Sequence, residues 1–77
     1  MDYRPEAVAA LLRHLREKRG LSQEVLSGLS GMARPHLSMI ERGERMPTLY
    51  TIWRIADALD MRPSELVALI EEEMEKN

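Results

Sequence analysis

The sequence contains no cysteine among its 77 residues. The chain can therefore form neither a disulfide framework nor a thiolate zinc site, and it has no cysteine nucleophile. It also lacks a long apolar run and an N-terminus with the layout of a secretory signal, which predicts a cytoplasmic protein without a membrane span. A chain of this length is expected to form one small domain with a compact, helical core.

Catalytic groups are equally scarce. The two histidines, His14 and His36, fall in different predicted helices, and no nucleophile, metal-ligand or phosphate-loop spacing accompanies them. His14 and Glu17 could chelate a metal weakly, but a solvated helix surface explains them more simply. The sequence therefore predicts no enzyme activity, no metal and no cofactor.

The net charge of −2 is unevenly distributed. Residues 1–45 carry eight Lys and Arg against six Asp and Glu, whereas residues 46–77 carry three against seven. A local field rather than the total charge attracts a phosphate, so the first part of the chain is compatible with nucleic-acid binding. Two ordinary solvated surfaces would give the same distribution.

Apolar spacing and helix-capping signals predict an all-α chain with five helices. Prolines suited to a first helical turn and glycines suited to a helix end set the expected bounds. The helices are expected over residues 5–19, 22–30, 34–42, 47–59 and 63–75, in a single domain spanning residues 1–77.

The second and third predicted helices are joined by a turn centred on Gly31. Helices joined so closely must cross at a small side chain, which Ser27 supplies, and they share an apolar core. Leu37 and Ile40 point to one side of the helix over residues 34–42, and its opposite side is narrow and begins with an arginine. A helix that enters the major groove of DNA with its N-terminus first presents such a face.

Residues 15–59 resemble the lambda-repressor-like, Cro-type helix-turn-helix domains of phage repressors and bacterial regulators. The matching elements are RxxRGLSQ at 16–23, glycine at 31, IERG at 40–43, PTL at 47–49 and IAxAL at 55–59. The resemblance implies a five-helix DNA-binding domain, with the helix-turn-helix at about residues 22–42.

By this resemblance, the DNA contacts divide into base-reading and backbone-binding residues. The base-reading positions are Arg34, Pro35, Ser38 and Met39. The backbone contacts are expected from Ser22, Gln23, His36, Arg42, Gly43, Arg45 and Thr48. Arginine can donate two hydrogen bonds to guanine, whereas proline and methionine can only touch thymine methyls or shape the fit. The alternatives are a phosphate clamp for Arg34, packing or plain exposure for Met39, and ordinary solvated charge for Arg42 and Arg45.

The resemblance also implies an internal ion pair between Arg16 and Glu41, which would hold the recognition helix against the first helix. An exposed pair of this kind contributes about 0–1 kcal/mol. Three positions depart from the family pattern. Ala33 and Arg62 stand where capping residues are usual, and Gly28 weakens its helix. Pro35 leaves open whether the third helix begins at residue 34 or 35.

The last predicted helix has an apolar arc wider than one buried stripe requires. We interpret Val67, Ile70 and Met74, with Trp53 at its edge, as a homodimer surface. Packing within the same chain is the alternative. The acidic run at 71–75 is expected to be solvated and to face away from DNA.

These features predict a sequence-specific regulator of transcription that binds a two-fold operator in double-stranded DNA as a homodimer. Its size resembles that of stand-alone regulators, including the controller proteins of restriction-modification systems. The rival hypothesis is an antitoxin-type interaction module that masks a toxin and regulates its own operon. A toxin and RNA polymerase are the further partners left open.

Overall fold

The computed structural model describes residues 1–76, which form five α-helices and no β-strand. The helices are α1 (Pro5–Lys18), α2 (Gln23–Leu29), α3 (Arg34–Glu41), α4 (Leu49–Ala58) and α5 (Pro63–Glu75). The all-α prediction is confirmed, and each helix end lies within two residues of its expected position. No helix in the described part of the chain is long and apolar enough to span a bilayer.

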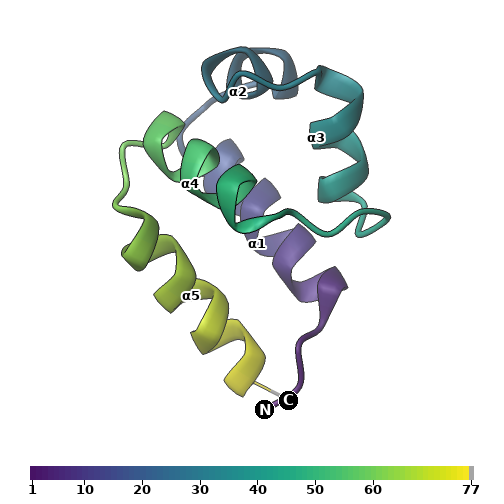
Figure 1. The fold of residues 1–77 in the computed structure, drawn as a ribbon, viewed down its shortest axis with the longest axis vertical. Helices are drawn as coiled ribbons and strands as arrows, with labels where there is room; N and C mark the ends of the chain where they lie inside the picture. The colour runs from purple at the N-terminus through teal and green to yellow at the C-terminus, as the bar shows by residue number, and fades with distance from the viewer. Residues whose placement is uncertain (77) are drawn as a thin grey trace.

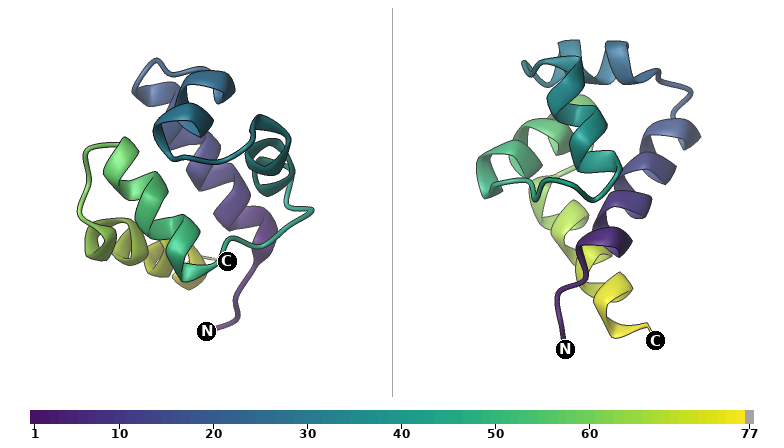
Figure 2. Two further views of the ribbon diagram at one scale, coloured as in Figure 1. Left: turned by 45° about the horizontal axis from the view of Figure 1, so that its top comes forward. Right: turned by 90° about the vertical axis from the view of Figure 1, so that its right-hand side faces the viewer.

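The helix-turn-helix pair and the two chain ends lie at opposite ends of the molecule. α2 and α3 form one end, α1 and α4 cross in the middle, and α5 runs down to the end where the N-terminus lies (Figure 1). The views in Figure 2 show the same separation. α3 packs against α1 and α2, and α4 packs against α2 and α5. α3 is therefore held mainly by the two helices that precede it.

Every helix contributes to one apolar core. The side chains share helical spacing on the inward faces, and each is at most 8% exposed. The core consists of Val8, Leu12, Leu26, Leu37, Ile40, Ile52, Ile55, Ala56, Leu59, Leu66 and Met74. Such packing, rather than intrinsic helix propensity, stabilises helices as short as α2 and α3.

The turn between α2 and α3 depends on Gly31, whose φ of +68° lies in the left-handed region. The Met32 amide donates to the Ser27 carbonyl at 2.9 Å, which closes the end of α2. An L side chain at residue 31 would be strained, so glycine allows the chain to reverse at once. The sharp turn sets the angle at which α3 leaves α2.

α3 begins at Arg34, the residue before Pro35, although proline disfavours helical geometry there. Ala33 is the N-cap and provides no side-chain hydrogen bond. The start is compatible with proline because the first-turn amides of a helix have no intrahelical partner. Arg34 therefore lies in the first turn, and the alternative start at residue 35 is not adopted.

A buried ion pair fastens α3 to α1. Arg16 Nε donates to Glu41 Oε2 at 2.7 Å and Nη2 donates to Oε1 at 3.0 Å. The side chains are only 11% and 2% exposed, so the expectation of an exposed, weakly contributing pair was wrong. The hydrogen bond with Glu41 raises the pKa of Arg16 further above its already high value. Burial turns this pair into a structural requirement, since either partner alone would be an uncompensated charge.

The end of α5 is held by Arg4, which precedes α1. The Arg4 guanidinium donates to the carbonyls of Glu73 and Lys76, and the Arg4 amide lies 3.0 Å from Met74 Sδ. Met74 is therefore only 8% exposed. Its expected place on an outward apolar face was wrong because the N-terminal segment covers it.

Removing one member of the buried pair should destabilise the fold. We expect Arg16→Met to lower the free energy of unfolding by about 3–5 kcal/mol, because the Glu41 carboxylate is left buried and uncompensated. The double variant Arg16→Met, Glu41→Leu should recover most of this loss. Urea unfolding followed by circular dichroism measures both, and a single-variant loss below about 1 kcal/mol would place the pair in the class of exposed pairs.

Candidate nucleic-acid interface

α3 separates its structural and its outward side chains. Leu37, Ile40 and Glu41 are buried against the rest of the domain. Of the predicted base-reading residues, Arg34 and Pro35 are exposed, and Ser38 and Met39 are half-exposed. The helix thus presents a continuous outward face that begins with the Arg34 guanidinium.

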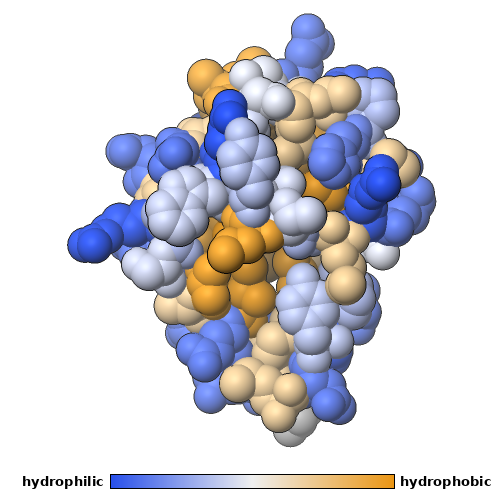
Figure 3. All heavy atoms as spheres, in the orientation of Figure 1, coloured by the Kyte–Doolittle hydropathy of each residue, from blue (hydrophilic) through white to orange (hydrophobic). Residues whose placement is uncertain are grey.

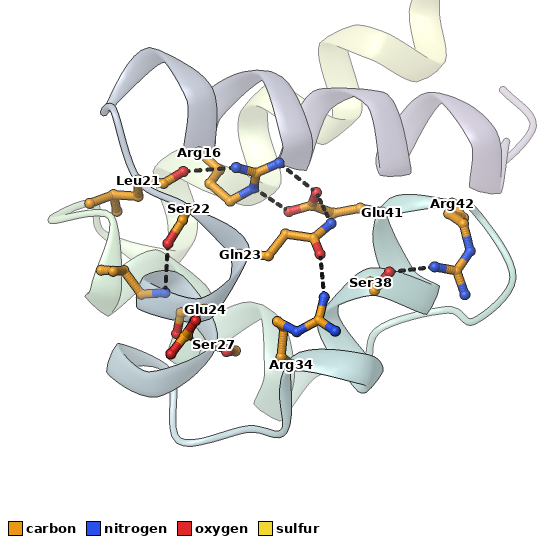
Figure 4. A network of polar contacts seen from close by, with 11 residues as sticks. Arg16, Leu21, Ser22, Gln23, Glu24, Ser27, Arg34, Ser38, Glu41 and Arg42 are labelled. Carbon is orange, nitrogen blue, oxygen red and sulfur yellow. Dashed lines mark hydrogen bonds and ion pairs between the residues drawn. The ribbon is translucent and has the colours of Figure 1, made fainter.

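Arg34 is linked to the buried ion pair through Gln23 (Figure 4). Gln23 Nε2 donates to Glu41 Oε1 at 3.0 Å, and Gln23 Oε1 faces Arg34 Nη1 at 3.5 Å. Only this orientation of the amide places a donor against the carboxylate and an acceptor against the guanidinium. Side chains from α1, α2 and α3 therefore form one polar chain that orients Arg34.

The start of α2 keeps side-chain donors for an anion. Ser22 Oγ accepts from the Val25 amide at 3.1 Å, so the hydroxyl serves as the N-cap and still has its own hydrogen to donate. The side-chain amide nitrogen of Gln23 donates one of its two hydrogens to Glu41, and no other hydrogen bond of this nitrogen is found within residues 1–76. The backbone N–H groups of the first turn, which have no intrahelical acceptor, add to what this helix start can offer an anion.

Arg42, at the end of α3, is paired in the free protein. It donates to both Glu44 carboxylate oxygens, at 2.8 and 3.1 Å, and also to the Ser38 hydroxyl. The hydrogen bond from Arg42 lowers the pKa of the Glu44 carboxyl below its usual range. A DNA phosphate would have to compete with Glu44 for Arg42.

The remaining predicted anchors differ in availability. The Gly43 amide donates to the Ile40 carbonyl at 3.1 Å, so a phosphate would have to compete with this carbonyl for it. Gly43, with φ of +75°, ends α3. Arg45 is exposed and forms no ion pair within residues 1–76. Thr48 Oγ1 accepts from the Thr51 amide at 3.1 Å and so caps α4.

His36 points away from the centre of the outward face. It is half-buried and lines a cavity with residues of α4, among them Tyr50 and Arg54. Sequence reasoning missed these two α4 residues. The available signal was their spacing of four, which places two residues on one side of a helix.

The predicted dimer residues surround an apolar surface on α4 and α5. Trp53 and Val67 are 53% and 44% exposed, whereas Ile70 packs against the core. Leu49, which the sequence analysis did not select, is 69% exposed beside them. Leu49, Trp53 and Val67 line a groove of about 450 Å³ with Arg62, Pro63 and Ser64. Figure 3 shows a hydrophobic area in the middle of the face formed by α4 and α5.

The described residues contain no group of three or more His, Asp or Glu side chains that could hold a metal ion. The chemistry available on this side of the molecule is that of guanidinium, hydroxyl and amide donors. Such groups can bind phosphate oxygens and base edges.

Comparison with known proteins agrees with this geometry. The family model described as Helix-turn-helix (HTH_3) matches residues 12–66. The chain is 39% identical to the uncharacterized HTH-type transcriptional regulator y4dJ of Sinorhizobium fredii over 72 residues, which cover 94% of this chain and 92% of the relative.

Solved structures with the same fold include controller proteins of restriction-modification systems. C.AhdI from Aeromonas hydrophila is 44% identical, with a TM-score of 0.75 over 79% of this chain and 92% of that chain. The C.Esp1396I tetramer, solved with its natural 35 base-pair operator, has a TM-score of 0.84 over 99% of this chain and 100% of that chain. At 24% identity, the second likeness shows the fold alone. The chain belongs to the HTH_3 helix-turn-helix family, the lambda-repressor-like class of transcriptional regulators.

Proposed function

We propose that the chain binds an operator in double-stranded DNA, in the cytoplasm, as a sequence-specific regulator of transcription, with α3 in the major groove. The observation that carries this proposal is the division of α3 into a buried side and an outward side that begins with Arg34. A helix supported from behind can enter a groove without losing its packing. The similar sequence of an HTH-type transcriptional regulator supports the same use of the fold.

In this proposal Arg34 reads a base. Its guanidinium can donate two parallel hydrogen bonds to guanine O6 and N7. Gln23, itself fixed by Glu41, limits the side chain's freedom, so less conformational entropy is lost on binding. Pro35 and Met39 provide apolar contacts for thymine methyls.

Backbone binding comes from two places that flank α3. The first turn of α2 offers amides and the positive end of its dipole. Arg42 and Arg45 lie at the other end of α3 and offer guanidinium groups. Contacts at both ends would fix the register of α3 in the groove but would carry no sequence information.

A second copy of the chain is the proposed occupant of the groove between α4 and α5. Trp53, Leu49 and Val67 would be exposed apolar side chains in a monomer, and an isologous contact would bury them on both subunits at once. Two recognition helices about 34 Å apart would then match one turn of DNA. The likeness to C.AhdI favours a controller-type regulator over an antitoxin.

DNA binding should weaken steeply with salt. Neutralised phosphates release counterions, so the logarithm of the binding constant should fall linearly with the logarithm of salt concentration, with a slope of about −0.9 per phosphate contact. Fluorescence anisotropy with duplexes selected from a random pool measures this slope. Equal affinity at low and high salt, or no bound duplex from the pool, would contradict the proposed function.

Arg34→Ala and Arg42→Ala should fail in different ways. Arg34→Ala should cost about 1–3 kcal/mol on the selected site and relax preference at one base pair per half-site. Arg42→Ala should weaken all sequences alike and reduce the salt slope by about one unit per subunit. Glu44→Ala is the matched control, because it frees Arg42 and should strengthen binding to all sequences. A base-by-base specificity profile of both variants distinguishes base reading from backbone binding. If Arg34→Ala keeps the wild-type profile and loses only affinity, Arg34 is a backbone anchor.

Charge placed in the groove between α4 and α5 should prevent dimerisation. We expect Val67→Glu to sediment as a monomer with an unchanged helical spectrum, because the exposed Val67 side chain contributes to the dimer surface and not to the core. Ala10→Glu adds the same charge at an exposed position on α1, which does not line this groove, and should leave the dimer intact. If the wild-type chain stays monomeric at high concentration and on DNA, the proposed dimer interface is wrong.

A further inference from the structure

A cavity of about 260 Å³ lies where α2, α3 and α4 meet. It is separate from the polar chain that orients Arg34 and from the apolar groove between α4 and α5. The residues that line it come from the turn after α2, the first turn of α3 and the outer side of α4. They are Ser30, Gly31, Met32, His36, Tyr50, Thr51 and Arg54.

Arg54 is the charged group of this cavity. Its Nη1 donates to the Tyr50 hydroxyl at 2.8 Å, and its guanidinium carbon lies 5.7 Å from the centre of the Tyr50 ring. Tyr50 therefore fixes the guanidinium over the Gly31 backbone, where a Cβ atom would collide with Arg54. Arginine has five N–H donors, and within residues 1–76 only this one hydrogen bond is found for them. Within residues 1–76, Arg54 therefore holds further N–H donors in a fixed position.

Ser30 provides an independent sign of a missing partner. It is 2% exposed, and its hydroxyl is the one buried side-chain oxygen or nitrogen in the described residues without a hydrogen-bond partner. An unpaired buried hydroxyl costs free energy, and native structures satisfy nearly all such groups. Ser30 lines the same cavity as Arg54 and His36.

The electrostatics of the cavity select an anion. None of its lining residues is acidic, and Arg54 is not in an ion pair within residues 1–76. His36 and the Tyr50 hydroxyl add further donors, and His36 belongs to the first turn of α3, where the helix dipole is positive. A guanidinium with other hydrogen-bond donors around it is a usual arrangement for a phosphate group.

We propose that Arg54, Tyr50 and His36 bind a phosphate group in this cavity. Two sources share that chemistry: a backbone phosphate of the operator, which rests on the proposed function, and a free phosphate-bearing small molecule, which does not. The operator phosphate would be an additional anchor beside the recognition helix. A free phosphate compound would lie against the α2–α3 turn and Gly31, the residue that sets the direction of α3.

The first experiment titrates the isolated protein with inorganic phosphate and follows backbone amide resonances at constant ionic strength. We expect saturable shifts at Gly31, His36 and Arg54. Arg54→Ala should weaken phosphate binding about tenfold or more, since it removes a charge-assisted hydrogen-bond donor. Tyr50→Phe should weaken it less, because it removes one uncharged hydroxyl, which holds Arg54 and donates to the phosphate, and leaves the guanidinium. Lys76→Ala is the control, since it removes one positive charge after α5, beside the N-terminal segment and outside this cavity.

The second experiment measures the salt slope of operator binding for the same variants. If the operator supplies the phosphate, Arg54→Ala should reduce the slope by about one unit per subunit without changing base preference, and free phosphate should compete with DNA. If phosphate binds the protein and the slope stays at the wild-type value, the source is a free phosphate compound.

Two results distinguish failure of this proposal from failure of the proposed function. If wild-type protein binds DNA but takes up no phosphate, and Arg54→Ala matches Lys76→Ala in salt slope, the phosphate site is overturned and the regulator remains. If wild-type protein binds no duplex, the proposed function fails and the titration alone decides the site.

Discussion

The ion pair between Arg16 and Glu41 is the interaction on which the DNA-binding end of this domain depends. Charges in a low-dielectric interior tolerate little displacement, because each loses its compensation when the other moves. The pair therefore fixes α3 relative to α1 more narrowly than apolar contacts alone would. Glu41 also accepts a hydrogen bond from the Gln23 side-chain amide, so α2 is bound to the same carboxylate. One buried acid thus aligns the three helices that precede α4.

Much of the fold could be predicted because its signals are local. Prolines in first turns, capping hydroxyls at Ser22 and Thr48, and glycines at helix ends mark the boundaries. The failures come from contacts between distant residues. Arg4 covers Met74 across 70 positions of sequence, and neither residue indicates the other. Gln23 and Gly43 remain proposed DNA contacts, but the Gln23 amide already donates one of its two hydrogens to Glu41, and the Gly43 amide donates to the Ile40 carbonyl. Residue type shows what a group can bind, and only the fold shows what it already binds.

The acidic composition of the chain is compatible with DNA binding because the charges are separated in space. The carboxylates of α5 follow one another toward the end where the chain termini lie, and α2 and α3 form the opposite end (Figure 1). Exposed charges separated by more than about 8–10 Å are largely screened at physiological salt. Near the end of α3, the acid that matters is Glu44, which lies against Arg42. The local balance there, and not the net charge, governs the approach of a phosphate.

The division of α3 into buried packing residues and outward residues has an evolutionary consequence. Leu37, Ile40 and Glu41 carry the packing, whereas Pro35, Ser38 and Met39 contribute little to it. Surface positions of this kind usually accept substitution within about 0.5 kcal/mol of stability. Proteins with this fold can therefore change their outward residues and come to recognise a new operator, because each variant along the way still folds. Duplicated copies can diverge in target while their interiors stay the same.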